Sequence, residues 1–105
     1  MAQFDVYINP SKHTRKTYPF ILDIQHNLIE DITTRIVVPL GNARQFKNEE
    51  LKVLTPKEAF DNKKILLLIP QIASMKTNYL KEPIGSLSHL RDEIIAALDL
   101  AITGI

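Results

Sequence analysis

The fold of this chain is decided by the sequence RIVVPL, residues 35–40. The run is apolar almost throughout, which is typical of a β-strand that is covered on both faces. A strand with one face in water alternates apolar and polar side chains instead. Pro39 has no N–H group to donate to a neighbouring strand, so we expect a bulge or a sheet edge near it. The run therefore predicts a buried strand in a β-rich domain.

Two strands are predicted before this run. Residues 2–10, AQFDVYINP, alternate apolar and polar side chains, which favours a half-buried strand. The side chains expected to face the core are those of Phe4, Val6 and Ile8, with those of Gln3, Asp5 and Tyr7 on the other face. The second strand runs from Tyr18 to Gln25 and is rich in β-branched and aromatic residues. Pro19 places the start of this second strand at a sheet edge or a bulge.

Further strands are predicted after the run. Short strands at Lys52–Leu54 and Lys57–Phe60 are expected to form a small hairpin or satellite sheet, in effect a small extra β wing. The nearly apolar sequence KKILLLIPQIA, residues 63–73, predicts a longer strand that is interrupted by Pro70. Residues 75–80, MKTNYL, are interpreted as the last strand, before the turn residues Pro83 and Gly85.

The hydrophobic period changes at residue 87, where a helix is predicted. Apolar residues recur there every three to four positions, at Leu87, Leu90, Ile94, Leu98 and Ala101. The helix should span about sixteen residues and end at Ile102, with Ser86 or Ser88 as its cap and Gly104 in a left-handed conformation after it. Asp92 and Glu93 suit the positive end of the helix dipole.

Several strands followed by one helix predict a mainly β fold of the α+β class, with an antiparallel sheet or barrel and one C-terminal helix. At 105 residues the chain is expected to form a single domain, residues 1–105. No signal peptide is recognised, and the longest apolar run, Ile65–Ile69, is far short of a membrane span, so we expect a soluble, cytoplasmic protein with no membrane partner.

Composition and spacing favour a binding protein over an enzyme. The net charge of +1 gives no basis for strong nucleic-acid binding, and the lack of cysteine excludes thiol chemistry. The three glycines and the three histidines are scattered, so neither a phosphate loop nor a metal site is expected, and no cofactor is predicted. The helix carboxylates are best explained as a solvated face, and His26 is a lone candidate for acid–base chemistry.

The apolar end of the sequence, AITGI at residues 101–105, allows two interpretations. In the first, a Schellman ending folds Ile105 back against Leu100 and locks the end of the helix. In the second, the last residues are presented to a partner. The residues alone favour the first.

Five stretches together resemble one protein family over nearly the whole length. They are QFDVY at residue 3, YPFILDIQHNLIED at residue 18, TRIVVPL at residue 34, QIASM at residue 71 and LSHLRDEIIAALDLAITGI at residue 87. In their order and placement they are similar to the CcdB family, the toxins of CcdA–CcdB toxin–antitoxin modules. Residues 41–64 match the family pattern poorly.

The resemblance implies a homodimer of SH3-like β domains that poisons DNA gyrase. Such a dimer binds the gyrase A subunit and holds the enzyme on cleaved DNA, so that it meets DNA only indirectly. A CcdA-like antitoxin, disordered when free, would neutralise it. The residues expected to contact gyrase are Asp99, Ile102, Thr103, Gly104 and Ile105 at the C-terminal end, with His26, Leu28 and Ile29 from the loop after the second strand. Leu28 and Ile29 could equally belong to the core.

The chain departs from plasmid-type members of that family at three of these positions. Thr103 stands where those members carry Trp, His26 where Ser is common, and Asp99 where Asn is common. A buried Trp is a frequent binding hot spot, so its replacement predicts weaker gyrase binding or altered contacts.

Two rival functions remain open at this point. The related MazF/Kid toxins share the type of fold and are ribonucleases, for which Arg35, Thr33 or Thr34, and His26 would be the candidates here. The near-neutral charge disfavours RNA binding, and the basic stretch 12–16 is better explained as a solvated loop. The other rival is an inactive homologue that still binds antitoxin.

Overall fold

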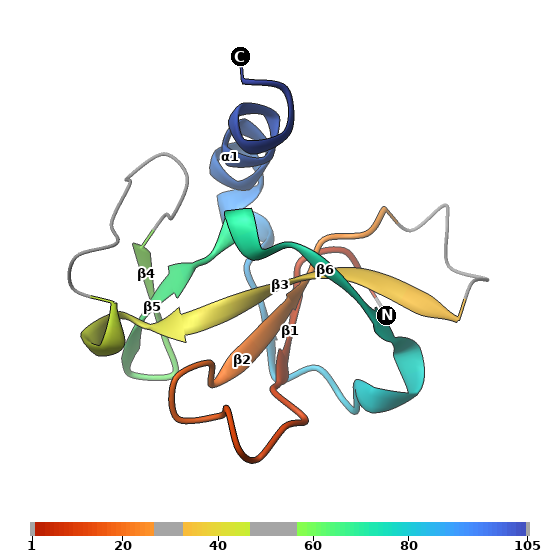
Figure 1. Ribbon diagram of the computed structural model, residues 1–105, viewed down its shortest axis with the longest axis vertical. Helices are drawn as coiled ribbons and strands as arrows, with labels where there is room; N and C mark the ends of the chain where they lie inside the picture. The colour runs from red at the N-terminus through yellow and green to blue at the C-terminus, as the bar shows by residue number, and fades with distance from the viewer. Residues whose placement is uncertain (1, 27–32, 47–56, 105) are drawn as a thin grey trace.

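The computed structural model describes residues 2–26, 33–46 and 57–104. In these residues a curled antiparallel sheet carries one α-helix at one end (Figure 1). The strands are β1 (Asp5–Ile8), β2 (Phe20–Asp23), β3 (Thr34–Asn42), β4 (Lys57–Phe60), β5 (Lys63–Leu67), β6 (Ala73–Lys76) and β7 (Gly85–Ser86), and the helix is α1 (Arg91–Thr103). The predicted mainly β fold of the α+β class is confirmed.

Strand β3 is the centre of the sheet. The strand order is β4-β5-β3-β2-β1-β7, and β6 also pairs with β3. On one side β3 pairs with β2; on the other, its residues 34–37 pair with β6 and its residues 40–42 with β5. Pro39 lies between the residues that pair with β6 and those that pair with β5. Pro39, which has no N–H group, therefore lies in an interior strand and in regular register with β2. The bulge or edge that was expected at Pro39 is not found in this ladder.

The sheet is covered on both faces. The larger cluster packs one face against α1 and includes Val6, Leu22, Val38, Ile94 and Ala97. A second cluster on the other face is formed by Tyr7, Ile21, Val37 and Leu80. Val6 and Tyr7 lie on opposite faces as the predicted alternation requires, but the expected burial is wrong at two positions: Tyr7 is fully buried on the second face, whereas Ile8 is 49 % exposed.

Several predicted strand boundaries also change. Strand β2 starts at Phe20, directly after Pro19, and it lies inside the sheet rather than at an edge. Strand β4 pairs with β5 through the turn at Asp61 and Asn62, so it extends the main sheet and is not a satellite. The predicted strand at residues 52–54 lies outside the described residues.

The predicted strands over 63–73 and 75–80 are divided differently in the structure. Strand β5 ends at Leu67, and Pro70 lies in a 3-10 turn, Ile69–Gln71, before β6. The residues Thr77–Tyr79 form another 3-10 turn instead of continuing a strand. The short strand β7, which pairs with β1, is formed where only turn residues were expected.

The helix is shorter at its start than predicted. A 3-10 turn, Ser88–Leu90, precedes α1, and the Ser86 hydroxyl accepts the Ser88 N–H of that turn at 3.1 Å. Leu90 is the N-cap and offers no side-chain cap. No helix in the described part of the chain is long and apolar enough to span a membrane.

Candidate functional site

The last turn of α1 leaves the body of the protein. Ile94 and Ala97 are fully buried against the sheet and fix the first half of the helix. Beyond Leu98 this contact ends: Ala101, which was expected on the core-facing stripe, is exposed, as are the residues up to Gly104. Figure 1 shows the end of the helix pointing away from the sheet. We call Asp99 and Ile102–Gly104 the C-terminal tip.

The backbone of the C-terminal tip has a defined ending. Gly104 adopts the predicted left-handed conformation, with φ of 75°, and its N–H donates to the Leu100 carbonyl at 3.1 Å. The Thr103 hydroxyl donates to the Asp99 carbonyl at 2.6 Å. The Leu100 carbonyl, which the helix end would otherwise leave unpaired, is thereby satisfied, and the Thr103 side chain is held against the preceding turn.

The tip presents the apolar side chain of Ile102 next to negative charge. Ile102 is 68 % exposed, the highest value among the exposed large hydrophobic residues described. Asp99 is exposed, no basic side chain lies in the last turn, and the helix dipole adds partial negative charge at this end. Such a surface is suited to docking through apolar contact and charge.

The structure brings together only part of the predicted site. Asp99, Ile102, Thr103 and Gly104 share the last turns of α1. His26 belongs to a different element, where it is exposed directly after the buried Gln25. Leu28, Ile29 and Ile105 lie outside the described residues, so the choice between core and surface for Leu28 and Ile29, and the expected contact of Ile105 with Leu100, stay predictions.

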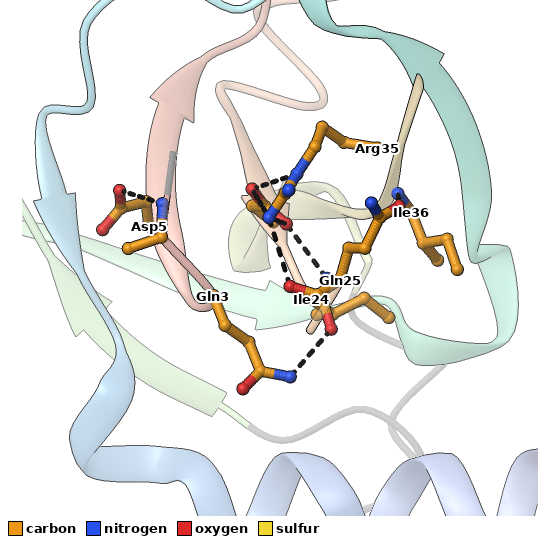
Figure 2. A network of polar contacts seen from close by, with 8 residues as sticks. Gln3, Asp5, Ile24, Gln25, Arg35 and Ile36 are labelled. Carbon is orange, nitrogen blue, oxygen red and sulfur yellow. Dashed lines mark hydrogen bonds and ion pairs between the residues drawn. The ribbon is translucent and has the colours of Figure 1, made fainter. Parts of the chain in front are cut away.

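Sequence reasoning missed a buried polar cluster next to His26. The Arg35 side chain is 1 % exposed and donates from Nε and Nη2 to the two carboxylate oxygens of Asp23, at 2.8 and 3.0 Å. Nη2 also donates to the Gln25 carbonyl at 3.1 Å (Figure 2). The signal available in the sequence was the placement of three polar residues, Asp23, Gln25 and Arg35, inside apolar strands.

The surroundings of this cluster shift two pKa values. Burial raises the pKa of Asp23 above its ordinary value, although the Gln25 N–H and the Arg35 guanidinium favour the carboxylate. Burial, together with the negative charges of Asp5 and Asp23, raises the pKa of Tyr7 to about 12. Both shifts follow from placing polar groups on a sheet face that is covered.

The geometry does not support the ribonuclease alternative. That reading requires an accessible guanidinium at Arg35, whereas this group is buried and occupied by Asp23 and Gln25. Among the described residues no cluster of histidine and carboxylate groups is arranged to hold a metal ion.

Comparison with known families agrees with the resemblance noted in the sequence. The family model described as CcdB protein matches residues 3–104, which is nearly the whole chain. The match includes the strands, α1, the buried cluster and the described part of the C-terminal tip.

Proposed function

Because the chain belongs to the CcdB family, the toxins of toxin–antitoxin modules, we propose that it binds the DNA gyrase A subunit and traps gyrase on cleaved DNA. In this proposal the protein acts by binding and is not itself an enzyme. Cleavage is performed by gyrase, and the toxin prevents religation, so that double-strand breaks accumulate.

The observation that carries the proposal is the exposed C-terminal tip on an anchored helix. Ile102 is 68 % exposed, so a partner that covers it would gain free energy by removing its apolar surface from water. The buried half of α1 and the capped ending at Gly104 fix Ile102 in advance, so binding loses little conformational entropy there. Thr103 and Asp99 then form the polar rim of the contact.

The proposed assembly is a homodimer that joins through the surface around β6. Among the described residues β6 pairs with β3 alone, which leaves its outer edge open. Ile36 is opposite Ser74 in this ladder, and Ile72 directly precedes β6, so both residues belong to the surface around β6. They are 40 % and 37 % exposed. A second copy on this face would bury both.

This dimer surface is close to the helix that carries the tip. Ile72 directly follows the 3-10 turn Ile69–Gln71, and α1 packs against that turn. A two-fold dimer formed through the β6 surface would present two tips, one from each protomer, which suits a two-fold target such as the gyrase A dimer. A CcdA-like antitoxin is the partner proposed to neutralise it.

The experiment is a comparison of gyrase binding with growth arrest. Binding of purified protein to the gyrase A subunit is measured by calorimetry, and growth is followed after induction in a gyrase-sensitive bacterium. We expect Ile102→Ser to weaken binding by at least about tenfold, because it removes the apolar anchor, and to relieve growth arrest.

The matched control is Glu93→Gln, an exposed change on the same helix away from the tip. It should leave both readouts unchanged. Growth arrest without gyrase binding would contradict the proposal, and so would equal binding by the Ile102→Ser variant.

A further inference from the structure

The β2–β3 ladder ends two residues before His26. Its last register pair is Asp23 with Val37, yet the chain stays beside β3 for two more residues before His26. Backbone pairing continues only through the Ile24 N–H, which donates to the Ile36 carbonyl at 3.0 Å. At Gln25, hydrogen bonds that involve side chains connect the two strands in place of backbone pairing.

Asp23, Gln25 and Arg35 hold both strands at this point. The Gln25 side-chain oxygen accepts the Ile36 N–H at 3.0 Å, in the place of a backbone carbonyl. The Gln25 carbonyl accepts from Arg35 at 3.1 Å, and the Gln25 N–H donates to the Asp23 carboxylate at 3.0 Å. Gln25 is therefore fixed through its N–H, its carbonyl and its side chain at once, and Figure 2 shows the contact of its carbonyl with Arg35.

The neighbouring backbone is secured from two further directions. The Gln3 side chain donates to the Ile24 carbonyl at 3.1 Å (Figure 2). Thr33 directly precedes β3, and the Thr33 carbonyl accepts both the N–H and the hydroxyl of Thr77, at 2.8 and 3.1 Å. The Ile24 carbonyl and the Thr33 carbonyl are thus both held by groups outside the β2–β3 pair.

We infer that Asp23, Gln25 and Arg35 are positioning residues, which fix the backbone that leads to His26, the residue that we propose as a second gyrase contact in addition to the C-terminal tip. This inference rests on the proposed function. It assigns these buried residues an effect on gyrase binding although none of them reaches the surface.

Stability alone does not account for such a cluster. Replacing a buried ion pair by apolar side chains of similar size is often neutral or stabilising, because the charges no longer lose their hydration. What apolar side chains do not supply is directional bonding to the Gln25 carbonyl and N–H. The property that depends on the pair is therefore the course of the backbone at Gln25.

The test separates these two properties. The double variant Asp23→Leu with Arg35→Met removes both charges of the ion pair, so that neither partner is left buried and unpaired. The single variant Gln25→Met removes the Gln25 side-chain amide, including the acceptor for the Ile36 N–H, and serves if the double variant does not fold. Ile65→Val, a fully buried change in β5, is the control for a general loss of stability.

Gyrase binding and hydrogen exchange of the Gln25 and His26 amides are measured on each protein at a temperature where all are folded. We expect both cluster variants to bind gyrase about tenfold more weakly and to exchange these two amides faster. Ile65→Val should change neither readout.

Cluster variants that are folded and bind gyrase like the unaltered protein would overturn the inference alone. An unaltered protein that does not bind gyrase would overturn the proposed function, and this inference with it.

Discussion

At the scale of single residues, the covered second face of the sheet has the largest consequences. Tyr7 is fully buried there, and its hydroxyl has no hydrogen-bond partner within the described residues. A buried hydroxyl that has lost water without gaining a partner costs about 1–3 kcal/mol. The ring packs with Ile21, Val37 and Leu80, so the site needs the aromatic ring and not the oxygen.

We therefore expect Tyr7→Phe to raise the free energy of unfolding at neutral pH by about 1 kcal/mol. Denaturant unfolding measures this difference. Tyr79→Phe is the matched control, because Tyr79 is 54 % exposed and its change should have little effect. A loss of stability in the Tyr7→Phe variant would mean that the hydroxyl has a partner in solution.

The same residue predicts a dependence on alkaline pH. Burial, with the charges of Asp5 and Asp23, raises the Tyr7 pKa from 10.0 to about 12. Between these values the unfolded chain releases the proton while the folded protein keeps it, so the free energy of unfolding falls as pH rises from 10 to 12. The full loss is about 3 kcal/mol.

This loss is measured as the difference in free energy of unfolding between the unaltered protein and Tyr7→Phe across that pH range. Lysines titrate in the same range in both proteins, so their contribution cancels in the difference. The gap between the two proteins should widen as pH rises. A constant gap would show that Tyr7 titrates alike in the folded and unfolded states.

At the scale of elements, the sequence predicted β3, β2 and α1 well because their signals are local. The left-handed ending at Gly104 and the first-turn acids Asp92 and Glu93 were predictable for the same reason. The burial of Tyr7 and the Asp23–Arg35 pair were not, since alternation tells which side chains share a face but not whether that face is covered. Of the candidate site, resemblance pointed to residues at the helix end, which the structure shows to be exposed, while their contact with gyrase stays a prediction. Sequence reasoning missed the buried cluster of Asp23, Gln25 and Arg35.

The β4–β5 turn offers a test at this scale. Asp61 and Asn62 have φ of 51° and 62°, the left-handed pair that a two-residue hairpin turn requires. Asn62→Gly should raise the free energy of unfolding by up to about 1 kcal/mol, whereas Asn62→Val should lower it by 1 kcal/mol or more, on the order expected for a β-branched residue at positive φ. Thermal unfolding compares the two, and equal stabilities would contradict this account of the turn.

At the scale of the whole molecule, the proposed dimer joins the sheet to the tips. Ile72→Glu places a charge in the proposed β6 surface, so it should convert the dimer to a monomer without unfolding the domain. Sedimentation equilibrium, with circular dichroism as the test of folding, measures this outcome. Ser11→Glu, an exposed change in the β1–β2 loop, is the control. A folded Ile72→Glu variant that remains dimeric would place the interface elsewhere.

At the same scale, we propose that the protein traps gyrase on cleaved DNA through its C-terminal tip. The most direct measurement incubates purified protein with gyrase, ATP and supercoiled plasmid, denatures the mixture and scores linear DNA, with Ile102→Ser, deletion of Ile105 and the Glu93→Gln control in parallel. We expect linear DNA with the unaltered protein and with Glu93→Gln. The amount of linear DNA should fall strongly with Ile102→Ser and with the deletion of Ile105. No linear DNA with the unaltered protein, in the presence of gyrase that supercoils normally, would contradict the account.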